Sequence, residues 1–474
     1  MRVVFLQNCF RIARNLTGSA TNGIDSTRQP TNFVIPAKAG THLDLDRLKM
    51  DPGFRRDDDA KSAPFGAAML LLLLSLLVCA SNALAQPSEE PALEVSLLTF
   101  GPGEVYWERF GHNAIVIRDP SSGRAISYNY GIFDFEEEDF FLNFIRGRMR
   151  YQIAANNAQD DIDYYVSQGR SVTEQQLRLS PEQARTLKNA LDTNLLPENR
   201  HYHYDYFTSN CSTKVRDQID AALGGSLRKQ MTSPSRGFTY RMLADSLTSP
   251  DPFLMGVIDI GLGPFSDQRL SFWKDSFVPM QLRDHLREMQ TTDETGNSVP
   301  LVREEHQLAE ARLAPPPPLP PDLRWPFLAI GVAFAWLIGF LSYRREQRWA
   351  RAGFATFAFL FSLACTSFGL ILLGLWGFTE HESAWANENL LLFSPLCLLL
   401  LPTWWQSAYV GWQASVFARR VAMLIALLAA FALFSKILSS FVQANLAWIL
   451  LLLPTHLVLA HAVRREPIEA PAAP

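Results

Sequence analysis

Cys211 is the only cysteine in the long polar middle of the chain, and it is placed to do covalent chemistry. It lies in the stretch YFTSNCSTKVRD (206–217), where apolar residues begin to recur at helical spacing. The pattern predicts a helix that starts near Cys211, with Ser209 or Asn210 as its N-cap. Free N–H groups and the helix dipole at such an end stabilise a thiolate and can hold a developing oxyanion. The other interpretation is a small buried hydrophobic residue at the start of a helix.

A cysteine nucleophile needs a base, and His112 is the candidate. It stands in ERFGHNAIVIRD (108–119), at the start of a predicted strand. Histidine is the most frequent general base in proteins. Taken alone, His112 is better explained as a surface or capping histidine. Three other histidines compete for the role: His201, His203 and His381.

The N-terminal part of the chain indicates export. Residues 1–68 show no periodicity and are interpreted as a leader from an over-extended gene start. Residues 69–85 have the apolar core and A-x-A ending of a signal peptide, with cleavage before Gln86. Cys79 follows a bulky Val78, which argues against a lipoprotein signal. The mature chain is therefore expected outside the cytoplasmic membrane.

Cys211 has no obvious disulfide partner in that oxidising compartment. The other cysteines stand in the leader, the signal peptide or apolar segments: Cys9, Cys79, Cys365 and Cys397. An unpaired exported thiol is a candidate for reactivity.

The chain divides into a polar half and an apolar half. Its formal charge of −4 argues against a nucleic-acid-binding protein, which would carry a concentrated basic face. Five apolar segments predict membrane spans at 325–343, 352–376, 390–405, 420–438 and 442–462. A proline-rich tether, 314–324, separates them from an exported domain over 86–313, and 464–474 is a cytoplasmic tail. Arginine-rich loops after the first span, before the fourth and after the fifth place these loops inside and the exported domain outside.

The exported domain mixes strands and helices, which makes it an α+β domain. β-Branched and partly alternating residues predict strands at 94–100 and 112–119, and two further segments, 123–133 and 171–180, are also predicted as strands. Helical spacing predicts helices at 136–148 and 180–195, the second with Ser180 as N-cap and Pro181 at its first position.

Four motifs together resemble the Lnb-type family, once catalogued as a domain of unknown function. They are FGHNAIVIRD, YNYGIFDF, NFIRGRMRYQI and YDYFTSNCSTKVRD, and the resemblance covers roughly residues 93–290. The membrane half is similar too, including HESAWANENLLLFSP (381–395). The resemblance implies a permuted papain-like (NlpC/LRAT-like) domain, with histidine before cysteine, followed by a five-helix transmembrane bundle.

The resemblance also implies an activity. It predicts an acyltransferase of the bacterial inner membrane that moves an acyl chain from a membrane lipid to the N-terminal amine of lipoproteins, through a Cys211 thioester. His112 would be the base, and the orienting or oxyanion group would come from Tyr128, Asn129, Tyr130 or Tyr204. The periplasmic loop 379–389 would face the substrates through His381, Trp385, Asn387 and Asn389, although ordinary interfacial anchoring explains this loop equally well.

Two other classes of function fit the same residues. The first is an exported cysteine hydrolase of peptides, amides or lipid esters, in which water resolves the intermediate. The second is a non-enzymatic, receptor-like membrane protein with a structural cysteine. Neither metal-ligand spacing nor a phosphate-binding loop is visible, so we expect no metal and no cofactor.

Overall fold

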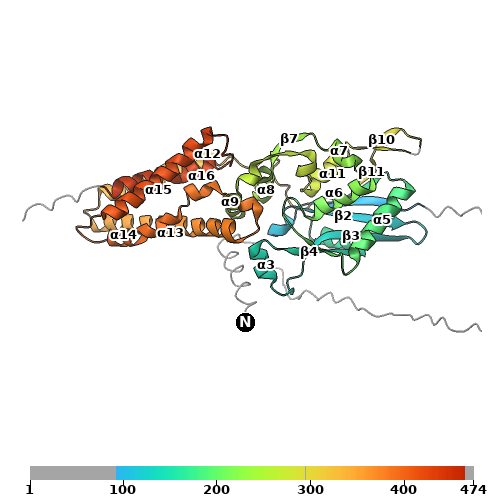
Figure 1. The fold of residues 1–474 in the computed structure, drawn as a ribbon, viewed down its shortest axis with the longest axis horizontal. Helices are drawn as coiled ribbons and strands as arrows, with labels where there is room; N and C mark the ends of the chain where they lie inside the picture. Colours follow the sequence, from blue (N-terminus) through green and yellow to red (C-terminus); the bar gives the residue numbers. More distant parts are fainter. Residues whose placement is uncertain (1–91, 294, 465–474) are drawn as a thin grey trace, which may run out of the picture. The chain divides into compact units, whose positions relative to one another are not determined.

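A computed structural model describes residues 92–293 and 295–464. The expected leader and signal peptide, and nearly all of the expected tail, lie outside the described residues. Within them the chain has a sheet-containing N-terminal part and a helical C-terminal part (Figure 1). The expectation of mixed α and β structure followed by apolar helices is therefore confirmed.

The N-terminal part is built on one seven-stranded antiparallel sheet. Its strand order is β11-β5-β1-β2-β3-β4-β6. In chain order the strands are β1 (Glu94–Phe100), β2 (His112–Asp119), β3 (Arg124–Ile132), β4 (Arg150–Asn157), β5 (Val172–Leu177), β6 (His201–His203) and β11 (Val302–Ala309). The strands that carry the FGH and YNYG motifs, β2 and β3, are thus neighbours near the middle of the sheet.

Helices cover both faces of this sheet. One face packs against α5 (Pro181–Leu195), α6 (Cys211–Ala222) and α11 (Pro279–Leu286), and the other against α4 (Ala158–Ser167). Side chains of β2 alternate between the two cores, with Ile115 on the first face and Ala114 on the second. Because both faces are buried, β2 reads as a nearly continuous apolar run rather than an alternating one.

Most predicted elements of this part are confirmed. β1 and β2 have the predicted bounds, and α5 starts at Pro181 after a Ser180 cap, which shares a capping box with Gln183. The predicted helix at 136–148 is the shorter α3 (Phe140–Arg146). Figure 1 shows α3 beside β4. Predictions from the sequence alone omitted β4, α4 and β6.

The segment between α6 and β11 folds into short helices and hairpins. These are α7 (Ser226–Gln230), β7 (Pro234–Thr239), α8 (Tyr240–Thr248), α9 (Pro252–Gly261), β8 (Arg269–Ser271), α10 (Phe272–Asp275), α11, β9 (Gln290–Thr292) and β10 (Ser298–Pro300). Residues 314–323 have neither helix nor strand, as a proline-rich tether should. The carbonyl of Pro317 nevertheless accepts a hydrogen bond from Ser246 of α8.

Three helices of the C-terminal part are long and apolar enough to cross a membrane: α12 (Arg324–Tyr343), α13 (Arg348–Phe378) and the segment Val416–Ile437, which contains α15 (Val416–Phe434). The third predicted span is a broken pair bent by 43°, Glu382–Leu391 and Pro395–Gln406, which includes α14 (Leu401–Gln406). The fifth, α16 (Leu446–Ala462), is a shorter apolar helix. Each of the five expected spans thus corresponds to an apolar segment of the structure. That the chain crosses the membrane five times stays a prediction.

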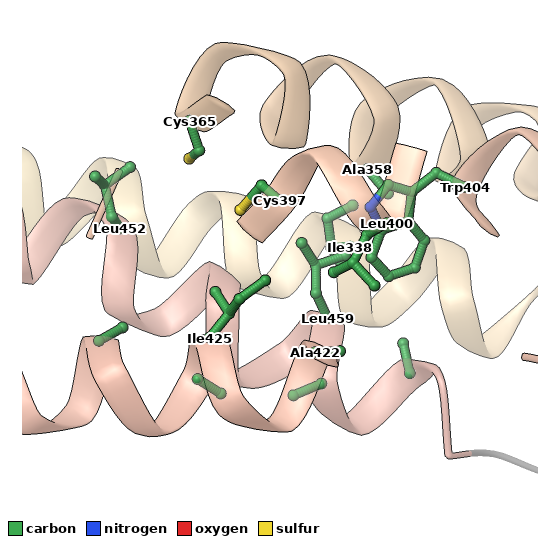
Figure 2. Close-up of a cluster of buried hydrophobic side chains, with 14 of the residues drawn as sticks. Ile338, Ala358, Cys365, Cys397, Leu400, Trp404, Ala422, Ile425, Leu452 and Leu459 are labelled. Carbon is green, nitrogen blue, oxygen red and sulfur yellow. The ribbon is translucent and has the colours of Figure 1, made fainter. Parts of the chain in front are cut away.

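Side chains from all these helices meet in one apolar core. Figure 2 shows Ile338 of α12, Ala358 of α13, Ile425 of α15 and Leu459 of α16 converging on the bent segment that carries Leu400 and Trp404. Trp404 is fully buried, and its indole N–H donates to Ser362 Oγ at 2.8 Å. Satisfying this polar group inside an apolar core fixes how the bent segment sits against α13.

Candidate active site

Cys211 is the first residue of α6, and the motif NCST builds the helix start around it. Asn210 is the N-cap, so the prediction that placed Cys211 in the first turn is confirmed. Asn210 Oδ1 accepts from the Thr213 N–H at 2.9 Å, and Thr213 Oγ1 accepts from the Asn210 N–H at 2.8 Å. The Ser212 hydroxyl donates to the carbonyl of Ser276 at 2.6 Å. Each polar residue of the motif therefore positions the backbone that holds the thiol.

α6 packs against β2 and β3, which brings Cys211 to the ends of the strands that carry the other site residues. The backbone N–H groups of Asn113, Ser212 and Cys211 itself are directed at its sulfur. Asn113 directly follows His112 in the chain. At Gly131 (φ +91°), an added Cβ would lie 3.3 Å from the Cys211 Cβ. Glycine is thus needed in the YNYG motif both for its conformation and for the space that Cys211 occupies.

Burial raises the pKa of the Cys211 thiol above its ordinary value, although the three N–H groups and the charge of Arg170 act in the opposite direction. The sequence predicted that the helix start would stabilise the thiolate. The N–H groups do favour it, but the loss of water outweighs them. The resting residue is therefore a thiol that needs a base.

His112 is oriented by Asn129 on the adjacent strand. Its Nε2 lies 2.9 Å from Asn129 Oδ1. An amide oxygen can only accept, so Nε2 carries the proton and Nδ1 keeps the free lone pair of a base. The imidazole is stacked near Phe100 and Tyr165, with ring centroids 5.9 Å away in each case. Burial lowers the pKa of His112 to about 4, so the ring is neutral at pH 7.

Asn129 is itself held by further hydrogen bonds. Its Nδ2 donates to Asp161 Oδ2 at 2.7 Å and to Ser127 Oγ at 3.1 Å. These donor contacts fix the amide so that its oxygen faces His112. Asp161 was not predicted from the sequence, because it lies on α4, a helix whose contact with β3 no local pattern reveals.

Arg170 is a second residue that the sequence analysis missed. It is 3% exposed, its Nε donates to the carbonyl of Gly101 at 2.7 Å, and its guanidinium lies 4.5 Å from the Tyr165 ring centroid. Its charge lowers the pKa of both His112 and Cys211. A buried cation beside the thiol favours the thiolate, which is the form that attacks.

Two tyrosines considered as orienting groups lie elsewhere. Tyr128 donates to Asp192 at 2.7 Å, and Tyr130 accepts from Asn194 at 2.7 Å, both on the face covered by α5. Alternation along β3 sends these side chains to the face opposite Asn129, where each hydroxyl has a partner on α5 instead of His112. Tyr204 stacks on Tyr151 with centroids 4.1 Å apart. Burial raises its pKa well above the ordinary value, and the nearby Cys211 charge raises it further.

Several side chains of the expected substrate loop, 379–389, make hydrogen bonds to backbone carbonyls of the protein. Asn387 and Asn389 are buried and donate to backbone carbonyls of α9, at 2.9 Å and 3.1 Å to Ile260. This geometry gives both a clamping role instead of the predicted substrate contact. Trp385 Nε1 donates to the Thr379 carbonyl at 3.0 Å, and its ring is 37% exposed.

His381 joins the loop to the N-terminal part. Its Nε2 lies 3.0 Å from the carbonyl of Phe144, and its ring stacks near Tyr206 at 5.9 Å. The competing histidines are also accounted for: His203 Nε2 lies 3.1 Å from the Gly147 carbonyl, and His201 is exposed on β6. In the described ranges, no three His, Cys, Asp or Glu side chains gather as metal ligands.

Comparison with known proteins supports the resemblance seen in the motifs. Residues 85–246 match the family model described as the Lnb N-terminal periplasmic domain, a range that includes His112, Asn129 and Cys211. No curated protein and no solved structure matches the chain. With its membrane-length apolar helices, the chain is a membrane protein with a periplasmic domain. The expected resemblance is confirmed over residues 85–246, which match the Lnb N-terminal periplasmic domain.

Proposed function

We propose that this chain is a thiol-dependent acyltransferase of the bacterial inner membrane. It takes an acyl chain from a membrane lipid onto Cys211 and passes it to the N-terminal amine of a lipoprotein. The observation that carries the proposal is the pairing of His112 with Asn129 beside a thiol at a helix start. A nucleophile, a base and a group that orients the base are the parts that covalent acyl transfer requires.

In the first half-reaction, Nδ1 of His112 takes the proton of Cys211, and the sulfur attacks the ester carbonyl of the lipid. The new S–C bond forms as the ester C–O bond breaks, and the leaving alkoxide takes the proton back from His112. The N–H groups of Ser212 and Asn113 face the reacting sulfur and can donate to the oxyanion formed next to it. The approach of His112 to within hydrogen-bond reach of Cys211 is part of this proposal.

In the second half-reaction, the lipoprotein amine attacks the thioester carbonyl. The N–C bond forms, the C–S bond breaks, and the proton lost by the amine returns to the sulfur through His112. A thioester is reactive enough to acylate an amine. Because donor and acceptor are both held in a bilayer, anchoring the periplasmic domain to membrane helices raises their effective concentration.

The test uses the full chain in vesicles of phospholipid with an alkyne-tagged acyl chain. We expect tagged protein that is cleaved by hydroxylamine, as a thioester is, and an acylated N-terminus when a diacylated lipopeptide with a free amine is added. The Cys211→Ser variant should carry no hydroxylamine-sensitive tag. The matched control is Cys365→Ser, which changes a buried thiol of the membrane core and should keep the tag.

Two outcomes would contradict the proposal. Tagged free fatty acid in place of acylated lipopeptide would identify a hydrolase. A Cys211→Ser variant that acylates the lipopeptide as wild type does would show that the cysteine is structural.

A further inference from the structure

An exposed band of aromatic side chains lies beside the candidate site. We name it the aromatic strip. It consists of the exposed rings of Trp107, Phe135 and Phe141, together with the half-buried Phe133 and the buried Phe140 on which they pack. The exposed fractions are 45% for Trp107, 53% for Phe135 and 51% for Phe141. The rings pack on one another, for example Phe133 on Phe135 with centroids 4.9 Å apart. Such a contiguous exposed apolar surface is typical of a site that contacts lipid or another apolar partner.

The strip reaches inward to the nucleophile. Phe133 follows two residues after Gly131, which lies against Cys211. Its ring packs on Tyr151 at 5.1 Å, and Tyr151 stacks on Tyr204 at 4.1 Å. A row of packed rings therefore runs inward from the surface to Tyr204, and it passes Phe133, two residues after the glycine that lies against Cys211.

The strip also reaches the membrane-proximal loop. α3, which carries Phe140 and Phe141, ends at Arg146, whose carbonyl accepts from the Glu380 N–H at 2.7 Å. Phe144 of the same helix contacts His381. Glu380 follows two residues after the end of α13, one of the helices of membrane-spanning length. The helix that carries part of the strip thus lies against the loop that directly follows an apolar helix of membrane-spanning length.

We propose that the aromatic strip binds the acyl chain of the lipid donor and aligns its ester with Cys211. The inference rests on the proposed function and deepens it, because it assigns the donor's binding surface. An extended apolar chain fits an extended apolar band better than a compact headgroup would. Each methylene that the strip buries favours binding, so the strip should discriminate by chain length.

The experiment compares two donors with the purified full chain at detergent levels that keep each donor monomeric. One is a water-soluble butyryl ester and the other carries a long acyl chain. The measured quantity is the ratio of their rates of thioester formation on Cys211. For the double variant Phe135→Ser/Phe141→Ser, we expect the long-to-short ratio to fall at least tenfold. The control is Phe253→Ser on α9, which is 77% exposed and outside the strip, and its ratio should stay within twofold.

A photoactivatable lipid gives a second measurement that does not depend on turnover. A diazirine at the end of its acyl chain should crosslink to peptides covering residues 133–145 in the wild-type chain. Crosslinks confined to 324–462, or an unchanged rate ratio in the double variant, would overturn the assignment. If the double variant bound vesicles less well but kept its ratio with monomeric donors, the strip would be a membrane-docking surface and the proposal would be wrong. Failure of the wild type to form any thioester would instead refute the proposed function.

Discussion

His112 Nε2 and Asn129 Oδ1 lie 2.9 Å apart across the neighbouring strands β2 and β3. The register pairs Ala114 with Asn129, so the histidine sits just beyond the last paired residues, where β2 begins. The contact leaves Nδ1 as the only basic nitrogen of the ring. Because the pKa of Cys211 is raised, the thiol needs a base to remove its proton. The contact with Asn129 fixes both the tautomer and the ring plane of His112 for that role.

We predict that Asn129→Ala slows acylation of Cys211 by about 10²-fold, since a catalytic group that loses its alignment by about 1 Å loses that much rate. The measurement is the rate of thioester formation with a soluble ester. The control is Asn194→Ala, which removes a similar side-chain bond, to Tyr130, on the opposite face of the sheet. An Asn129→Ala rate within threefold of wild type would show that Asn129 does not orient the base.

The residues near Cys211 and His112 were predictable because local rules place them. A cap, a helical repeat and a strand start are all visible in single stretches of sequence. Asn129 was one of four candidates, and only the pairing of β2 with β3 separates it from Tyr128 and Tyr130. Asp161 and Arg170 come close to the site because α4 and the residues after it pack on the sheet face opposite α6. No sequence motif indicates this packing.

The bend in the third apolar segment was beyond sequence reasoning for a similar reason. Its composition favours a membrane span, but Pro395 and the burial of Trp404 against α13 decide its path. The sequence predicts Asn387 and Asn389 as substrate contacts because the charges of the loops place 379–389 on the same side of the membrane as the catalytic domain. Their partners are carbonyls of α9, more than a hundred residues earlier in the chain.

The pH dependence of Cys211 alkylation should follow from the raised pKa of the thiol. The thiolate is the reactive form, and burial raises the pKa of Cys211 above its ordinary value, so the alkylation rate should keep rising into the alkaline range without a plateau between pH 5 and 8. Arg170 lowers this pKa, so Arg170→Gln should shift the curve to higher pH. Iodoacetamide alkylation of the full chain, followed by mass spectrometry, measures it. Arg124→Gln at the exposed start of β3 is the control. A plateau below pH 8 in wild type would indicate a thiolate–imidazolium pair and contradict the neutral resting site.

Arg241 should contribute strongly to stability. It is 3% exposed, donates to Asp267 and Asp259 at 2.9 Å and 2.5 Å, and also reaches the carbonyl of Leu262. Removing the cation leaves two buried carboxylates without their positive partner, and Asp259 keeps only its bond from the Trp448 indole. Losing one partner of a buried ion pair typically destabilises a protein by about 3–5 kcal/mol. We therefore expect Arg241→Met to lower the Tm of the full chain in detergent, as measured by circular dichroism.

The control for this change is Arg236→Met. Arg236 is 3.6 Å from Glu288 in an exposed pair, and exposed pairs contribute only about 0–1 kcal/mol. A Tm for Arg241→Met that equals the Arg236→Met value would show that the buried cluster does not hold α8 to its neighbours.

Gly147 should be the residue that allows the periplasmic domain to dock on the loop after α13. It has a φ of +76°, and a Cβ there would lie 2.8 Å from backbone atoms of Glu380 and His381. Gly147→Val should therefore separate α3 from the loop and break the contact between Arg146 and Glu380. Tryptic cleavage at Arg148 in the folded full chain should become faster, because its ion pair with Glu380 is also lost.

The matched control separates this contact from backbone strain. Gly237 has a φ of +90° and no heavy atom within 4 Å of an added Cβ, so Gly237→Val carries the same kind of strain without a clash. Both variants should lose some stability, but only Gly147→Val should expose Arg148 to trypsin and reduce acylation by lipid in vesicles. Equal proteolysis in the two variants would mean that the domain is not held to the loop at this point. The aromatic strip would then need another explanation for its position beside α13.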